Sequence, residues 1–291
     1  MTVTKTDQKK VTLADLTTKE YPSWCQGCGD HTILFTLKNA LVELDIDPHN
    51  VVIVTGIGCG SKVNHFIRAY GFEGLHGRAL PVASGIKLAN KDLTVIVVGG
   101  DGDGYGIGGN HFIQSMRRNL DITYLVQNNA VYGLTKGQYS PTSSKGFKSS
   151  STPDGALEEP INPLATAIVS GATYVARGYS METKHLQKLI VDAVRHKGFS
   201  LVDILQICTT YNKVNTWDFF KQRLYKLEGS NYDATSRRGA LQKAEEWGDK
   251  IPIGLLYKDE HKPSYEDKYA DSIVGHDISN VDITPFLNRF R

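Results

Sequence analysis

The residues most able to do chemistry in this sequence are its four cysteines, Cys25, Cys28, Cys59 and Cys208. The first two form a Cys-x-x-Cys pair in the segment YPSWCQGCGDHT, residues 21–32. Such a pair occurs in disulfides, thioredoxin-type redox motifs, zinc sites and iron–sulfur clusters. Four thiolates complete one zinc site or one 4Fe–4S cluster, although a chain of 291 residues can also hold four unrelated buried cysteines.

The composition narrows these options. The chain is 40% hydrophobic and 22% charged with a formal net charge of +2, which is typical of a soluble globular protein. No basic run indicates nucleic acid, and no apolar run is long enough for a signal peptide or a membrane span. We therefore expect a cytoplasmic protein with no membrane or nucleic-acid partner. Structural disulfides are disfavoured in that compartment.

A glycine-rich segment, GDGDGYGIGG at residues 100–109, is the second candidate site. Residues 104–109 match G-x-G-x-x-G, the dinucleotide fingerprint. A nicotinamide site also requires an acidic residue at the end of the next strand, where Gln127, Asn128 and Asn129 stand instead. A P-loop requires Gly-Lys-Ser/Thr, which does not follow.

A third interpretation rests on Gly100-Asp101-Gly102 followed by Asn128-Asn129, which resembles the GDG…NN signature of thiamine diphosphate (TPP) enzymes. A diphosphate requires Mg²⁺, which prefers carboxylate and carbonyl oxygens such as those of Asp101 and Asn129. Glycine backbone N–H groups at a helix N-terminus can approach the phosphates. The alternative is that Asp101 caps a helix and the two asparagines only form a turn.

The elements that must position these residues follow from the hydrophobic pattern. Asp30 is the predicted N-cap of the first helix. Helices that alternate with strands rich in β-branched residues predict an α/β fold, a parallel twisted sheet with helices on both faces. The expected helices are 31–44, 81–90, 108–119, 161–171 and 181–198, and the expected strands 51–55, 93–100, 121–129, 172–178 and 199–208. Beyond them we expect helices at 215–227 and 236–248 and then a polar tail.

The motifs fall after the predicted strands, so they gather at the carboxyl edge of the sheet, where such folds bind ligands. We divide the chain into an N-terminal arm (1–20), a cofactor-binding α/β domain (21–210) and a C-terminal extension (211–291) that packs on the domain or on a partner subunit. The polar loop 133–160 is too long for a simple connector, which favours a functional role.

The order and spacing of the motifs resemble those of the β subunits of 2-oxoacid:ferredoxin oxidoreductases, from about Trp24 to Tyr257. The matching segments are WCQGCG, TGIGCGSK, LHGRALPVASGIKLAN, GGDGDGYGIGGNH, NNAVYGLTKGQYSPTS, QICTTYN and IPIGLLYKDEHKPSYE. The resemblance implies a sheet of the TPP diphosphate-binding type.

The resemblance also implies the cofactors. One 4Fe–4S cluster would be bound by Cys25, Cys28, Cys59 and Cys208. Mg²⁺ would be bound by Asp101, Asn129 and the main-chain carbonyl of Val131. The residues expected to bind TPP are Ile57, Gly58, Cys59, Ser61, His76, Gly77, Gly100, Asp101, Gly102, Asp103, Gly104, Asn129, Val131, Tyr132, Gly133, Leu134 and Thr135.

The implied reaction is the oxidative decarboxylation of a 2-oxoacid with coenzyme A as co-substrate. We favour 2-oxoglutarate going to succinyl-CoA and CO₂, with electrons passing through the cluster to ferredoxin, or the reverse carboxylation. The candidate catalytic residues are His76, Arg78 and Lys136, of which Lys136 would bind a distal carboxylate. His76 and Lys136 can equally be a structural histidine and a solvated lysine.

TPP also requires an activating glutamate, which no motif here supplies. We therefore expect an α subunit to provide it, together with part of the coenzyme A and substrate site, in an αβ or (αβ)₂ assembly. Pyruvate or broad 2-oxoacid specificity is the nearest alternative. A cluster-free TPP decarboxylase or synthase, a non-catalytic Cys₄ zinc protein and a nicotinamide dehydrogenase remain as further ones.

Overall fold

The centre of the molecule is one eight-stranded sheet with the order β2-β1-β3-β4-β6-β5-β8-β7. The computed structural model describes residues 10–269 and 282–290. All neighbouring strands run parallel except β5 and β8, which are antiparallel. The strands are β1 (Val51–Thr55), β2 (Tyr70–Glu73), β3 (Thr94–Gly100), β4 (Thr123–Asn128), β5 (Tyr174–Tyr179), β6 (Ser200–Leu205), β7 (Leu224–Lys226) and β8 (Ile251–Lys258).

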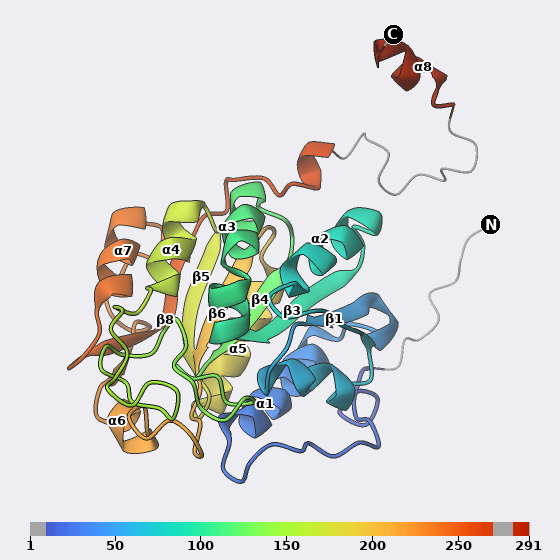
Figure 1. Cartoon of the computed structure of the whole chain (residues 1–291). Helices are drawn as coiled ribbons and strands as arrows, with labels where there is room; N and C mark the ends of the chain where they lie inside the picture. The colour runs from blue at the N-terminus through green and yellow to red at the C-terminus, as the bar shows by residue number, and fades with distance from the viewer. Residues whose placement is uncertain (1–9, 270–281, 291) are drawn as a thin grey trace.

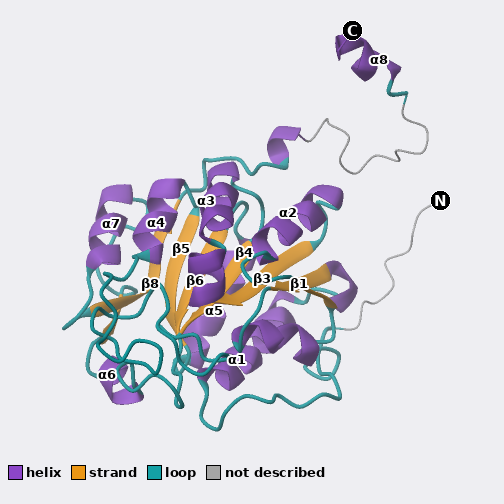
Figure 2. Cartoon of the chain, viewed as in Figure 1, coloured by secondary structure: helices purple, strands orange, loops and turns teal. Residues whose placement is uncertain are grey.

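Helices cover both faces of this sheet, as Figures 1 and 2 show. The helices are α1 (Gly29–Leu44), α2 (Ala79–Ala89), α3 (Gly109–Arg118), α4 (Pro163–Ser170), α5 (Thr183–Arg195), α6 (Trp217–Lys221), α7 (Arg237–Glu245) and α8 (Thr284–Leu287). Side chains of α2, α3, α4 and α7 share one hydrophobic cluster, and those of α1 and α5 share a second. The predicted α/β class with helices on both faces is confirmed.

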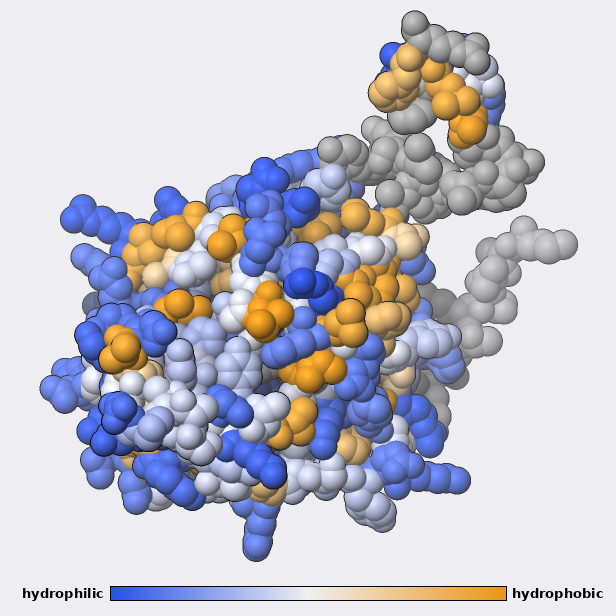
Figure 3. All heavy atoms as spheres, in the orientation of Figure 1, coloured by the Kyte–Doolittle hydropathy of each residue, from blue (hydrophilic) through white to orange (hydrophobic). Residues whose placement is uncertain are grey.

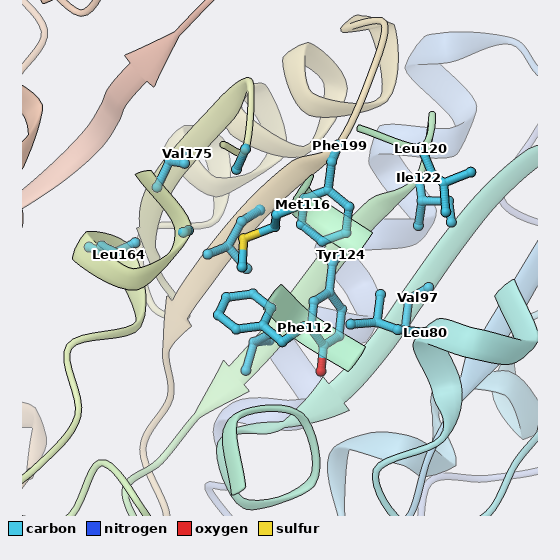
Figure 4. Close-up of a cluster of buried hydrophobic side chains, with 14 of the residues drawn as sticks. Leu80, Val97, Phe112, Met116, Leu120, Ile122, Tyr124, Leu164, Val175 and Phe199 are labelled. Carbon is cyan, nitrogen blue, oxygen red and sulfur yellow. The ribbon is translucent and has the colours of Figure 1, made fainter. Parts of the chain in front are cut away.

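The strands explain why two clusters form. Along β1, Val52 and Val54 belong to the first cluster, whereas Val51 and Ile53 belong to the second. Successive side chains of a strand point to opposite faces, so a strand buried on both sides must be apolar throughout. Figure 4 shows the first cluster, where Phe112 of α3 lies against Tyr124 of β4 with ring centroids 6.2 Å apart.

Three sequence expectations were wrong in detail. The N-cap of α1 is Cys28, which has extended backbone angles, and Asp30 is already inside the first turn and fully buried. Residues 215–227 are not one helix, because only α6 forms before the chain turns into β7. Residues 251–258 are not part of a polar tail, because β8 pairs with the free edge of β5 and buries Ile251, Ile253 and Leu256.

One strand had no sequence signal. All residues of β2 are exposed, so this edge strand lacks the apolar run that marks the buried strands.

The two ends of the chain pack differently. In the N-terminal arm, Leu16 is fully buried and Thr17 forms an isolated bridge with Ile67, so residues 10–20 lie against the domain. Residues 1–9, 270–281 and 291 fall outside the described part. In the C-terminal extension, β7 and β8 belong to the central sheet itself. Every helix within 10–269 and 282–290 is too short or too polar to serve as a membrane span.

Candidate cofactor site

A pocket of about 100 Å³ lies where β1, β3 and β4 end. Its walls come from the turns that follow these strands and from the start of the 133–160 loop. The pocket is lined by Ile57, Gly58, Cys59, Gly60, His76, Gly100, Asp101, Gly102, Asp103, Gln127, Asn129, Val131, Tyr132, Gly133, Leu134 and Thr135. The sheet therefore brings most of the expected TPP-binding residues together, while Ser61, Gly77 and Gly104 do not line the pocket.

Asp101 is the buried acid of this pocket, with a side chain that is 1% exposed. The hydroxyls of Ser140 and Thr142 both donate to its Oδ2, the latter over 2.6 Å. Burial raises the pKa of Asp101 to about 6, although these two hydrogen bonds oppose the shift. A divalent cation would favour the ionised carboxylate, and so would offset the cost of burying this charge.

Asn129 and Val131 complete the set of expected oxygen ligands. The side-chain Oδ1 of Asn129 accepts the Val131 N–H over 3.0 Å. The main-chain carbonyl of Asn129 accepts from the side-chain amide of Asn212 over 2.8 Å. These bonds fix the turn after β4, so that Asn129 and Val131 line the same pocket as Asp101. Carboxylate, amide and carbonyl oxygens fit the preference of Mg²⁺ for hard ligands.

The buried carboxylate of Asp103 connects its own turn to the loops that carry Ile57 and Gly77. Its Oδ1 accepts the N–H groups of Ile57 and Gly77 over 3.0 and 2.7 Å, and the ring of His76 over 2.7 Å. A carboxylate only accepts, so Nδ1 of His76 carries the proton in this contact. Nε2 of His76, which is half-buried at the pocket wall, is therefore free of that bond.

The structure separates the other two candidate catalytic residues from the pocket lining. Arg78 is exposed at the N-cap of α2. Lys136 is exposed one residue beyond the lining residue Thr135 and has a left-handed backbone with φ of 78°. Ser61 is fully buried behind the turn that follows β1.

The four thiols gather beside this pocket. A Cβ atom placed on Gly133 would lie 3.6 Å from the Sγ of Cys59 and 3.8 Å from that of Cys208. Cys25 and Cys28 share a tight turn in which the Cys28 N–H donates to the Cys25 carbonyl over 3.1 Å. Cys59 itself lines the pocket, so the thiol group and the oxygen ligands meet in one place.

The surroundings of Cys28 and Cys59 favour the protonated form of these two thiols. Burial and then the charge of Asp30 raise the pKa of Cys28, and the same two causes raise the pKa of Cys59 to about 11. The negative charge that Cys208 carries when it is deprotonated also raises the pKa of both. Metal binding must therefore displace protons here.

The spacing of possible ligands differs from that of a single-ion site. Among residues 10–269 and 282–290, no three His, Cys, Asp or Glu side chains converge tightly enough to hold one metal ion. A zinc ion draws its four ligands to one point, whereas a 4Fe–4S cluster binds each thiolate at a different iron. The four cysteines supply the number of thiolates that either group requires.

Sequence reasoning missed the polar residues that support the site. Gln127 lines the pocket, and Thr142 contacts both Asp101 and Asn128. Asp203 of β6 in turn accepts from Asn128 over 3.1 Å. The hydroxyl-rich segment QYSPTS was visible in the sequence, but nothing in its pattern indicates that the loop folds back onto Asp101.

Comparison with known proteins defines the class first. Residues 56–204 match the family model "Thiamine pyrophosphate enzyme, C-terminal TPP binding domain", and residues 208–272 match the model of the C-terminal part of the pyruvate ferredoxin oxidoreductase beta subunit. The first match covers every residue that lines the pocket. The fold and the site are thus those of a TPP enzyme domain.

Individual relatives define the family within this class more narrowly. The chain is 46% identical over 278 residues to the β subunit of 2-oxoacid:ferredoxin oxidoreductase 1 of Aeropyrum pernix, covering 92% of this chain and 87% of the relative. It is 46% identical over 198 residues to the 2-oxoglutarate oxidoreductase subunit KorB of Mycobacterium tuberculosis, covering 68% of this chain and 53% of the relative.

A solved structure supports the same family. The 2-oxoglutarate:ferredoxin oxidoreductase of Magnetococcus marinus, with 2-oxoglutarate, coenzyme A and succinyl-CoA bound, superposes with a TM-score of 0.90 at 37% identity, covering 99% of this chain and 98% of that one. The chain belongs to the family of 2-oxoacid:ferredoxin oxidoreductase β subunits, which confirms the resemblance seen in the motifs and makes it part of an oxidoreductase.

Proposed function

We propose that this β subunit acts with an α subunit in the coenzyme A-dependent oxidative decarboxylation of 2-oxoglutarate to succinyl-CoA and CO₂. Electrons would leave through one 4Fe–4S cluster to ferredoxin, and the reaction could also run in reverse as carboxylation. The observation that carries the proposal is that Cys59 lines the same pocket as Asp101 and Asn129. A redox group held by the thiols would therefore adjoin a cofactor held by the oxygens.

The oxygen ligands would hold the diphosphate end of TPP. Asp101, Asn129 and the carbonyl of Val131 would bind Mg²⁺, and the backbone N–H groups of the 100–104 turn would bind the phosphates. Ile57, Tyr132 and Leu134 supply the apolar walls. When bound, TPP supplies the reactive carbon and the electron sink that decarboxylation requires.

The four thiols would hold the cluster. Cys25, Cys28, Cys59 and Cys208 lose their protons when they bind iron, and the bound cluster supplies a one-electron carrier. The missing side chain of Gly133 supports this role, since a Cβ atom at this pocket residue would lie 3.6 Å from the Sγ of Cys59 and 3.8 Å from that of Cys208.

The polar residues around the pocket would recognise the substrate. Asp103 orients His76 through Nδ1, which leaves Nε2 as a hydrogen-bonding group for a reacting oxygen or for the diphosphate. Arg78 and Lys136 are exposed cations close in the chain to the lining residues His76 and Thr135, and Lys136 is our candidate for the distal carboxylate of 2-oxoglutarate. Pyruvate lacks that carboxylate. An enzyme that acts on pyruvate, or on a broad range of 2-oxoacids, is the second candidate.

The surface around the pocket supports an α-subunit partner, which the β-subunit family also implies. Figure 3 shows hydrophobic side chains gathered over and beside α2. Beside the pocket, Leu75 is 77% exposed and Ile107 is 54% exposed. Large apolar side chains exposed around a site are typical of a surface that another chain covers. The α subunit would add the activating glutamate and part of the coenzyme A site, in an αβ or (αβ)₂ assembly.

The test is an anaerobic assay of co-expressed α and β chains with TPP, Mg²⁺, coenzyme A, ferredoxin and a panel of 2-oxoacids. We expect ferredoxin reduction that depends on coenzyme A and is fastest with 2-oxoglutarate. Faster turnover of pyruvate would select the second candidate. Decarboxylation without ferredoxin reduction, by a protein that lacks iron, would indicate a cluster-free TPP enzyme and contradict the proposal.

A further inference from the structure

Gln206 is a buried amide next to the cysteine group. It follows β6 directly, lies two residues before Cys208 in the chain and is 1% exposed. Its Nε2 donates to the Sγ of Cys28 over 3.2 Å and to the carbonyl of Ile207 over 3.2 Å. A side-chain amide nitrogen carries two protons, so it can make both hydrogen bonds at once.

The backbone around Gln206 holds this amide in place. The Gln206 N–H donates to the Asn128 carbonyl over 2.9 Å, and the Gly29 N–H donates to the Ile207 carbonyl over 3.1 Å. A Cβ atom on residue 29 would lie only 2.9 Å from the Gln206 Cγ, so the space for this side chain exists because residue 29 is glycine. Gln206 is thus clamped between the end of β6 and the start of α1.

We infer that Gln206 is a positioning residue whose N–H···S hydrogen bond to Cys28 raises the reduction potential of the cluster. This inference rests on the cluster of the proposed function. One-electron reduction adds negative charge to the cluster and its thiolates, and a hydrogen-bond donor stabilises the more negative state more strongly. The bond is part-buried, and the lower dielectric there strengthens its effect relative to a bond in open water.

The experiment is an anaerobic redox titration of the purified αβ complex, followed by electron paramagnetic resonance. Gln206→Leu removes the donor at nearly the same size, and Gln206→Glu places a carboxylate at the same position. We expect both variants to keep their iron and their Mg²⁺–TPP affinity, and to shift the midpoint potential to more negative values. Gln222→Leu, at an exposed glutamine after α6, is the matched control and should leave the potential unchanged.

The outcomes separate the inference from the function on which it rests. If wild type holds the cluster and both Gln206 variants titrate at its potential, the tuning role is wrong while the proposed function stands. If wild type holds no cluster under anaerobic isolation, both fail. If only Gln206→Leu loses its iron, Gln206→Glu becomes the test. A more negative midpoint potential in that variant supports the tuning role, and a wild-type potential contradicts it. Loss of the cluster from both variants would make Gln206 a requirement for assembly, which contradicts a tuning role.

Discussion

At the scale of single residues, we propose that Asp101 connects burial to cofactor binding. Its pKa is raised to about 6, and Mg²⁺ binds only the ionised carboxylate. Above that pH the carboxylate is already ionised, so affinity for Mg²⁺–TPP should be nearly constant. Below it each unit of pH should weaken binding about tenfold, because a proton must first be displaced. Isothermal titration calorimetry of the αβ complex between pH 5 and 8 measures this dependence.

The control for that titration is Asp101→Asn, which has no titrating carboxylate. We expect this variant to bind Mg²⁺–TPP weakly at every pH, with no inflection near pH 6. Wild-type affinity that stays unchanged down to pH 5 would show that Asp101 is not a metal ligand.

Lys136 is the residue on which substrate choice is predicted to depend. Lys136→Ala removes an exposed cation next to the lining residue Thr135, so it should raise the KM for 2-oxoglutarate about tenfold or more, the size of one charge-assisted hydrogen bond. The KM for pyruvate should change little, since pyruvate has no distal carboxylate. Steady-state kinetics with both substrates measure the difference.

Lys148→Ala is the matched control, because Lys148 is an exposed lysine of the same 133–160 loop and stands farther along the chain from the lining residue Thr135 than Lys136 does. It should leave both constants unchanged. Equal rises in the two KM values of Lys136→Ala would remove Lys136 from substrate recognition.

The cysteine group is predicted to be separable from the TPP site. Cys25 is the exposed member of the group and does not line the pocket. Cys25→Ser should therefore lose the broad absorption near 400 nm, bound iron and ferredoxin reduction, while Mg²⁺–TPP affinity stays at the wild-type value. Iron analysis and calorimetry on the same sample test both halves. Retention of a full set of iron would refute the assignment of Cys25.

At the scale of elements, α3 fixes the glycine-rich turn onto the sheet. Phe112 is 2% exposed, and its ring packs against Tyr105 and Tyr124 at centroid distances of 5.0 and 6.2 Å. Phe112→Ala should lower the free energy of unfolding by about 3–5 kcal/mol, through lost burial and the cavity left behind. The adjacent Ile113 is 42% exposed, so Ile113→Ala should change it by only about 0.5 kcal/mol or less. Urea denaturation followed by circular dichroism would compare the two, and equal effects would contradict this packing.

The elements also show what the sequence could predict. The strands Val51–Thr55 and Thr94–Gly100 were predicted because burial on both faces demands an unbroken apolar run. The edge strand Tyr70–Glu73 carries no such pattern, since all its residues are exposed. Ile251–Lys258 was misjudged because its pairing with β5 joins residues far apart in the chain. Local patterns report burial, whereas edge pairing is a tertiary property.

The same distinction holds within the site. Asp101 and Asn129 could be found because they stand at strand ends, and parallel strands bring those ends to one edge. Ser140 and Thr142 could not, because their contacts with Asp101 depend on the path of the 133–160 loop. Gln206 could not be predicted for a similar reason, since it contacts Cys28, which lies far from it in the sequence.

At the scale of the whole molecule, the chain is one subunit of a larger oxidoreductase. Family membership implies an α subunit, and the exposed Leu75 and Ile107 beside the pocket are suited to contact it. We therefore expect the purified β chain alone to leave 2-oxoacids unchanged, and the co-purified αβ complex to turn them over. The central claim is that the TPP pocket and the cysteine group act together within this chain, with Cys59 belonging to both.

The most direct measurement of that claim is the absorbance near 400 nm of the αβ complex, loaded with TPP and Mg²⁺, when 2-oxoglutarate is added without oxygen or ferredoxin. We predict that the absorbance bleaches as the cluster is reduced, that coenzyme A accelerates the change, and that Cys25→Ser shows none. Conversion of 2-oxoglutarate by the wild-type complex with no change in the cluster signal would contradict the coupling of the two sites.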